Sequence, residues 1–127
     1  MADILVIDDM DDVREGIAAV LGQGGHTVTE AKNGREGIEL LKQRGFDLVI
    51  TDILMPEQDG TEVIMHLDTL PKRPPVLAIS GGAAKVPAYI ALHLARLKAD
   101  ATLMKPFRNA ELLEKVTNLL ASPAASS

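Results

Sequence analysis

The sequence predicts a three-layer α/β domain, in which a doubly wound parallel sheet of five strands is covered by helices on both faces. Short apolar runs rich in β-branched residues recur along the chain, and a longer segment with helical spacing follows each of them. Hydrophobic residues make up 46% and charged residues 24%, as in an ordinary globular domain. The 127 residues suffice for one such domain and leave no room for a second.

The strands are expected at the apolar runs. Residues 4–7 (ILVI) and 76–79 (VLAI) are apolar throughout, as strands buried on both faces are. Residues 26–31 alternate only weakly, which is typical of a strand near the edge of a sheet. The expected strands are residues 4–7, 26–31, 47–51, 76–79 and 100–104.

Helices are expected between the strands, and several carry their own start signals. Asp12 and Glu15 are predicted to cap the first helix, and Asn33 and Glu36 the second. Pro87 suits the first turn of a fourth helix, where its missing N–H costs nothing. A final helix carries a run of apolar side chains at helical spacing, namely Leu112, Leu113, Val116, Leu119 and Leu120.

Composition and charge restrict the classes of function. The net charge of −5 argues against generic binding of duplex DNA, and the scarcity of aromatic residues argues against stacking on single-stranded bases. The chain has no cysteine, so disulfides and thiolate metal sites are excluded. We expect a cytoplasmic protein without membrane insertion, because the first residues lack the basic and apolar regions of a signal peptide and no apolar run approaches the ~20 residues that span a bilayer.

Polar side chains capable of chemistry stand directly after the apolar residues of four expected strands. Asp8 and Asp9 follow the first strand and Asp52 follows the third. Ser80 follows the fourth strand and Lys105 the fifth. The carboxyl ends of parallel strands lie along one edge, where open α/β sheets bind ligands. We therefore expect these side chains to meet at one site.

The expected site favours a hard cation and phosphoryl chemistry. Two carboxylates ~4–5 Å apart repel each other by roughly 3–4 kcal/mol at an effective dielectric constant of about 20, so three of them require protonation or a bridging cation. Oxygen ligands without cysteine favour Mg²⁺ before Ca²⁺. A carboxylate can attack phosphorus, while Lys105 supplies positive charge and Ser80 a hydroxyl donor.

These residues resemble the receiver domain of response regulators in two-component signalling, of which the chemotaxis regulator is the single-domain type. The matching stretches are residues 4–9, 47–60 (DLVITDILMPEQDG), 76–82 and 101–107 (ATLMKPF). The acidic pair, the D-x-x-M-P-x-x-D-G motif, the strand-end serine and K-P-F are specific in combination. The resemblance implies the flavodoxin-like strand order 2-1-3-4-5. Residues 1–121 would form the receiver domain and residues 122–127 a flexible C-terminal tail.

The resemblance also implies a role for each site residue. Asp52 would be the phosphoacceptor. Asp9 and Asp52 would bind Mg²⁺ together with the backbone carbonyl of Leu54, and Asp8 would hold a metal-bound water. Lys105 would pair with the phosphoryl group.

Three further residues belong to the implied switch and to the loop beside it. Ser80 corresponds to the switch hydroxyl that moves to the phosphoryl oxygen. The bond between Lys105 and Pro106 would be cis, a form that costs far less before proline than elsewhere. Thr102 stands at the second switch position, where the family often has an aromatic residue, and a threonine cannot swing a ring inward.

The expected function is that of a stand-alone response regulator. A sensor histidine kinase or phosphotransfer protein would donate a phosphoryl group from phosphohistidine to Asp52. The added charge would change a protein-binding surface around helix 4, strand 5 and helix 5, which a downstream protein target would read. Such a chain is a signalling module that assists its own phosphorylation and dephosphorylation, not an enzyme. Tyr89 and Leu92 add an apolar strip to the fourth helix, which is explained either by a broad buried face or by a surface for a partner protein or a homodimer.

Other classes of function remain as alternatives. A haloacid-dehalogenase-like phosphohydrolase also uses an aspartyl nucleophile, but it has a second Asp where Leu54 stands, and this chain has no cap domain. A transcription factor needs a DNA-reading module, and only residues 122–127 follow the final helix, so direct nucleic-acid binding is not expected. A degenerate receiver that signals without phosphate would lack site residues that are all present here.

Overall fold

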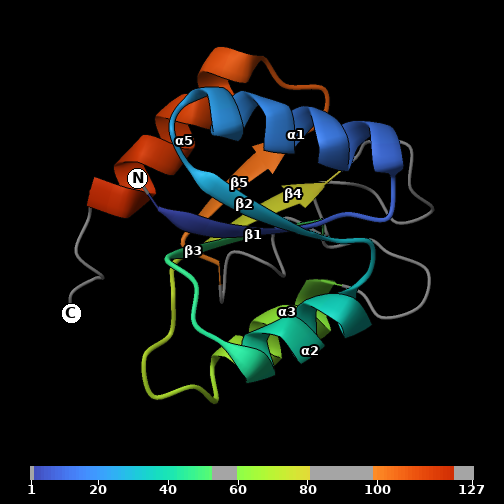
Figure 1. Cartoon of the computed structure of the whole chain (residues 1–127), viewed down its shortest axis with the longest axis vertical. Coiled ribbons are helices and arrows are strands. Elements are labelled where there is room, and N and C mark those ends of the chain that lie inside the picture. Colours follow the sequence, from blue (N-terminus) through green and yellow to red (C-terminus); the bar gives the residue numbers. More distant parts are fainter. Residues whose placement is uncertain (1, 53–59, 81–98, 122–127) are drawn as a thin grey trace.

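A computed structural model describes residues 2–52, 60–80 and 99–121, which form a parallel sheet between two helical layers (Figure 1). The strands are β1 (Asp3–Ile7), β2 (Thr27–Ala31), β3 (Leu48–Asp52), β4 (Val76–Ser80) and β5 (Ala101–Met104). They form a five-stranded sheet in the order β2-β1-β3-β4-β5, with all neighbouring strands parallel. The predicted fold class and strand order are confirmed.

Helices cover both faces of the sheet. The α1 helix (Asp11–Gln23) and the α5 helix (Asn109–Ala121) lie on one face, and α2 (Gly34–Gln43) and α3 (Gly60–Leu67) lie on the other (Figure 1). The fourth helix predicted near Pro87 and the predicted tail at 122–127 lie outside the described residues. Within the described part of the chain, no helix is long and apolar enough to cross a membrane.

The apolar residues of the central strands divide between two cores. In β1, Ile4 and Val6 belong to the core beneath α1 and α5, while Leu5 and Ile7 belong to the core above α2 and α3. All four are essentially buried, because successive side chains of a strand point to opposite faces and both faces are covered. This burial on both faces holds β1 in place within the sheet. It therefore also positions Asp8 and Asp9, which follow β1 at the carboxyl edge.

The α2 helix begins with the predicted cap. The Asn33 side chain accepts a hydrogen bond from the Glu36 N–H at 2.9 Å, and Glu36 Oε1 accepts one from the Lys32 N–H at 3.0 Å. Both bonds satisfy donors that a helix start would otherwise leave without a partner. The prediction of Asn33 and Glu36 as the cap is confirmed.

The predicted cap of α1 is wrong. The helix begins at Asp11 with Met10 at the N-cap position, and no side chain caps it there. Asp12 lies inside the first turn, where its negative charge favours the positive end of the helix dipole but its carboxylate cannot act as the N-cap. The aspartate that fixes the start of this segment is Asp8, whose Oδ1 accepts a hydrogen bond from the Met10 N–H at 2.9 Å.

Candidate functional site

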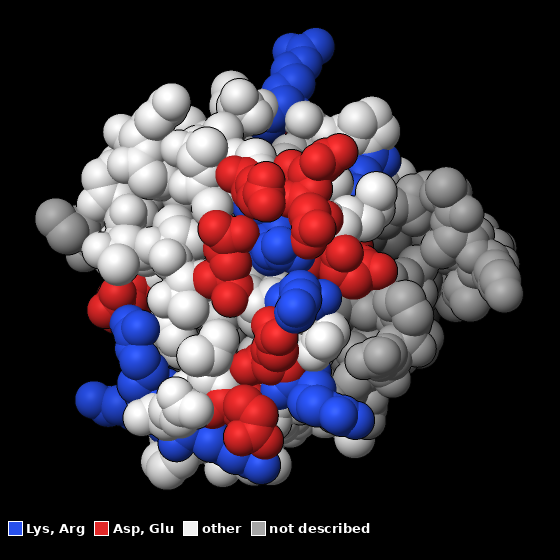
Figure 2. Space-filling model, turned by 45° about the vertical axis from the view of Figure 1, so that its right-hand side comes forward, with Lys and Arg blue, Asp and Glu red and all other residues white. Residues whose placement is uncertain are grey.

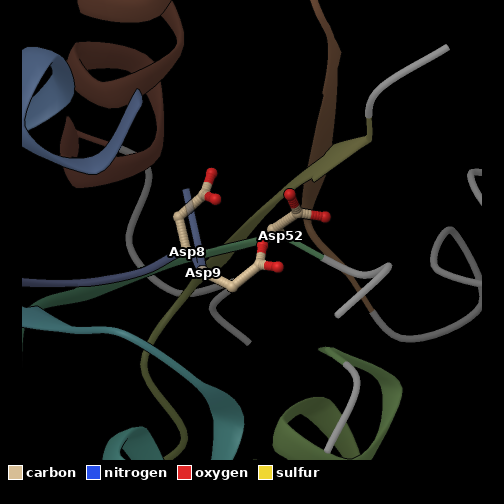
Figure 3. Close-up of side chains that lie close together, drawn as sticks. All are labelled: Asp8, Asp9 and Asp52. Atoms are coloured by element: carbon tan, nitrogen blue, oxygen red, sulfur yellow. The ribbon is translucent and has the colours of Figure 1, made fainter. Parts of the chain in front are cut away.

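Three carboxylates gather at the carboxyl edge of the sheet. Asp8 and Asp9 follow the end of β1, and Asp52 is the last residue of β3. Each of the three side chains offers an oxygen that lies within 4.8 Å of those of the other two (Figure 3). Asp8 and Asp52 are buried and Asp9 is exposed, so the group opens to solvent on one side. The structure therefore brings together the three aspartates that the sequence predicts at one site.

Lys105 points into this group from the segment that follows β5. Its Nζ lies 2.9 Å from Asp52 Oδ2 and 3.2 Å from Asp8 Oδ2. The Lys105 side chain is only 15% exposed, so these ion pairs are well shielded from water. Acidic and basic side chains also interleave on the molecular surface seen from this side (Figure 2).

Burial and neighbouring charges perturb the titration of two groups in the site. Burial raises the pKa of Asp8, and the charge of Asp52 adds to this, while the Met10 N–H and the Lys105 ammonium act in the opposite direction. Burial alone would lower the pKa of Lys105, but its contacts with Asp52 and Asp8 outweigh that effect and leave the pKa raised. A protonated lysine therefore compensates part of the carboxylate charge.

Asp8 is held at three of its polar groups. Its N–H donates to the Ala31 carbonyl at 3.1 Å, its carbonyl accepts from Arg14, and its Oδ1 accepts from the Met10 N–H. The remaining oxygen, Oδ2, is buried and lies 3.2 Å from the Lys105 ammonium. A buried carboxylate oxygen can accept from more than one donor, so Oδ2 can also bind a cation or a cation-bound water.

The donor set of this group fits a hard divalent cation. Among the described residues, the side-chain ligands of this group are carboxylate oxygens, and the exposed Asp9 leaves one side open to water and to a phosphate oxygen. Mg²⁺ typically takes one or two carboxylates, several waters and a substrate phosphate. Asp8, Asp9 and Asp52 are therefore the residues that could hold Mg²⁺.

The other predicted site residues are placed only in part. Ser80 is the last residue of β4 and pairs with Met104, so its backbone lies at the same edge of the sheet. Thr102 lies within β5 opposite Ala78 and is half-buried, on the face that carries the α2 and α3 core. The Lys105–Pro106 peptide bond is cis, as predicted. Leu54 lies outside the described residues, and so does the side chain of Ser80.

One residue beside the site was missed in the sequence. Arg14 in α1 is buried and donates a hydrogen bond to the backbone carbonyl of Asp8 at 2.9 Å. The signal was present, because Arg14 falls on the same helical stripe as the buried residues Ile17 and Leu21. A charged residue on a buried stripe requires partners, and Asp11, three positions earlier, lies on the same face of the helix.

Comparisons with known proteins place the chain in a family. Residues 4–117 match the model of the response regulator receiver domain. Response regulator MprA of Mycolicibacterium vanbaalenii is 34% identical over 92% of this chain, and transcriptional regulatory protein CusR of Escherichia coli is 32% identical over 96%. The match covers 49% of MprA and 52% of CusR, so the chain spans about half the length of these relatives.

A solved structure agrees with this result. Response regulator protein TrrA of Thermotoga maritima, determined in complex with Mg(2+)-BeF, has a TM-score of 0.81 and 32% identity, covering 94% of this chain and 99% of TrrA. The strand order β2-β1-β3-β4-β5 and the carboxylates at the carboxyl edge of the sheet, together with the family match, are those of a receiver domain of two-component signalling. The chain belongs to the response regulator receiver domain family.

Proposed function

We propose that this chain accepts a phosphoryl group on Asp52 and signals through the resulting change in its surface. One observation carries the proposal. Asp52 ends β3 beside two further carboxylates and lies 2.9 Å from the Lys105 ammonium, in a chain of the receiver domain family. A nucleophilic carboxylate next to a fixed positive charge and a cation-binding group is the arrangement that phosphoryl transfer to aspartate requires.

The proposed step is an in-line displacement at phosphorus. A carboxylate oxygen of Asp52 forms the new O–P bond, and the P–N bond of a phosphohistidine in the donor protein breaks. The electron pair of that bond stays on the imidazole nitrogen, which takes a proton from water. Lys105 then neutralises part of the charge on the equatorial phosphoryl oxygens. The proposed donor is a sensor histidine kinase or a phosphotransfer protein. We propose that the phosphoryl transfer occurs in the cytoplasm.

Mg²⁺ is the proposed cofactor of this step. Asp9 and Asp52 would hold it together with the backbone carbonyl of Leu54, and Asp8 would hold a metal-bound water. When bound, the ion supplies positive charge next to the phosphoryl oxygens. The relative TrrA supports this assignment, because its structure was determined with Mg(2+)-BeF. Asp8 contributes a buried carboxylate oxygen, Oδ2, whose negative charge a cation or a cation-bound water can help to balance.

The proposed response begins at the ends of β4 and β5. The Ser80 hydroxyl would move to a phosphoryl oxygen, as Ser80 ends the strand next to β3. Thr102 is proposed as the second switch position, two residues before the end of β5. The change would alter a protein-binding surface around helix 4, β5 and α5, which a downstream protein or a second copy of the chain reads. The receiver domain itself assists both its phosphorylation and its dephosphorylation.

Acetyl phosphate with Mg²⁺ tests the proposal directly. We expect intact-mass spectrometry to show one added phosphoryl group on the wild-type chain and none on Asp52→Asn. Asp12→Asn is the matched control, because Asp12 is an exposed carboxylate of α1 outside the group of three aspartates. Chelation of Mg²⁺ with EDTA should stop the reaction. An unmodified wild-type mass at millimolar Mg²⁺, or equal modification of Asp52→Asn, would refute the assignment of Asp52.

A further inference from the structure

Arg14 lies behind the turn that carries Asp8 and Asp9. Its side chain is 11% exposed, and each guanidinium nitrogen has one acceptor. Nη1 donates to the Asp8 backbone carbonyl at 2.9 Å, Nη2 to Asp11 Oδ1 at 2.7 Å and Nε to Glu30 Oε1 at 3.0 Å. One side chain therefore joins the end of β1, the first turn of α1 and strand β2.

The contact with Asp8 uses the backbone and not the carboxylate. Arg14 donates to the carbonyl oxygen, so it orients the peptide that links Asp8 to Asp9 without occupying any side-chain oxygen of the site. Lys105 differs in this respect, since its ammonium pairs with carboxylate oxygens of Asp8 and Asp52. Arg14 and a cation would thus act on opposite sides of the same turn and would not compete for ligands.

The buried bond has more weight than the two ion pairs. The side chains of Asp11 and Glu30 are 70% and 40% exposed, and exposed ion pairs contribute little to stability. They do compensate the charge of the Arg14 guanidinium. The bond to the Asp8 carbonyl is buried, and a charged donor to a buried carbonyl makes one of the stronger hydrogen bonds in a protein.

We propose that Arg14 is a positioning residue that orders the Asp8–Asp9 turn in advance for a divalent cation. The proposal rests on the metal site of the proposed function and adds a residue that touches neither the metal nor the phosphoryl group. Binding costs less when the ligands are already in place, because the turn then loses less conformational freedom. The planar guanidinium reaches three acceptors at once, which an ammonium on a flexible stem cannot reproduce.

Mg²⁺ titration by isothermal calorimetry tests the proposal on the whole chain. We expect Arg14→Met to weaken Mg²⁺ binding by about tenfold, the range seen when a residue that orients a metal ligand is removed. Arg14→Lys keeps the positive charge but loses the planar set of guanidinium donors. Its affinity for Mg²⁺ should lie between those of Arg14→Met and the wild type.

Arg73→Met is the matched control. Arg73 is a half-buried arginine, 24% exposed, whose guanidinium pairs with Asp68 and Asp100 near the opposite end of the sheet. Its loss should lower thermal stability and leave the Mg²⁺ affinity unchanged. Wild-type Mg²⁺ affinity in Arg14→Met would overturn the proposal. An equal loss of affinity in Arg73→Met would also overturn it, because general destabilisation would then explain the effect of both substitutions.

A second measurement separates this inference from the proposed function. Amide hydrogen exchange without metal should become faster at the Met10 and Asp8 N–H groups in Arg14→Met but not in Arg73→Met, because both groups belong to the turn that Arg14 holds. A wild-type chain that binds no Mg²⁺ would defeat the proposed metal site, and the exchange data would still decide whether Arg14 orders the turn. Unchanged exchange at both amides would overturn the role of Arg14.

Discussion

Lys105 and Asp52 are separated by 53 positions in the sequence, and yet Lys105 Nζ lies 2.9 Å from Asp52 Oδ2. The same ammonium lies 3.2 Å from Asp8 Oδ2, so one cation is shared between two buried carboxylates. Each of the three residues comes from the end of a different strand. This shared charge is the feature from which the first three predictions follow.

Removal of the ammonium should slow phosphoryl transfer. We expect Lys105→Met to reduce the rate of phosphorylation by acetyl phosphate about 10²–10³-fold, the usual loss when one donor to a developing negative charge is deleted. Time-resolved mass spectrometry at saturating Mg²⁺ gives the rate. Lys42→Met, which removes an exposed lysine on α2, should react like the wild type. Equal rates for both variants would show that Lys105 has no part in the transfer.

The raised pKa of Lys105 predicts a loss of stability at alkaline pH. Between the ordinary lysine value of 10.5 and the raised folded-state pKa, the folded chain binds more protons than the unfolded chain. The free energy of unfolding therefore has its full Lys105 contribution below 10.5 and loses it as the pH rises through the folded-state value. Urea unfolding of the wild type should show this decline, and Lys105→Met should show less of it. Parallel profiles for the two chains would contradict the prediction.

Asp8→Asn should stabilise the metal-free chain and weaken its binding of Mg²⁺. Because the pKa of Asp8 is raised above its ordinary value of 3.8, ionisation of Asp8 costs stability as the pH rises from 3.8 through the folded-state pKa. Above the folded-state pKa that cost is fully present, and an uncharged amide avoids it. We expect a gain of about 0.5–2 kcal/mol in the free energy of unfolding, measured by urea denaturation with EDTA. A less stable Asp8→Asn would mean that the pairing with Lys105 outweighs burial.

Gly37 permits α2 to approach β1 closely. A Cβ at this position would overlap Ile7 Cδ1 and lie 2.9 Å from Ile7 Cγ1. Ile7 is the residue directly before Asp8 in the chain. We expect Gly37→Ala to destabilise the fold, since overpacking costs about 1–3 kcal/mol and exceeds the helix-propensity gain of about 0.5–1 kcal/mol. Gly16→Ala is the control, because a Cβ at Gly16 in α1 meets no atom within 4 Å. Urea unfolding should give opposite signs for the two variants.

The sequence predicts most of this architecture because its strand signals are strong and its polar residues stand in informative places. Runs such as ILVI and VLAI have the two-sided apolar character of central strands, and an aspartate or lysine directly after such a run marks the edge of the sheet. The geometry of Asp8, Asp9, Asp52 and Lys105 follows from that placement. The strand order came from family resemblance, since strand signals alone do not fix which strands are neighbours.

Local competition between side chains was harder to predict. Asp12 and Glu15 have the spacing of a capping pair, but the start of α1 depends on the hydrogen bond from the Met10 N–H to Asp8. The α5 helix gives a similar example. Arg108 has no capping oxygen, and the Glu111 side chain accepts the hydrogen bond of the Arg108 N–H instead. In each case several nearby side chains could accept the same backbone N–H. Which of them does so depends on distances that exist only in the folded chain.

The placement of Lys105 after β5 affects when a growing polypeptide acquires its chemistry. A nascent chain that has left the ribosome only as far as β4 already contains every aspartate of the site but not the ammonium that balances their repulsion. Its carboxylates would depend on a bound cation alone to balance their repulsion. Under the proposed function, such an intermediate would lack the ammonium that pairs with the proposed acceptor Asp52.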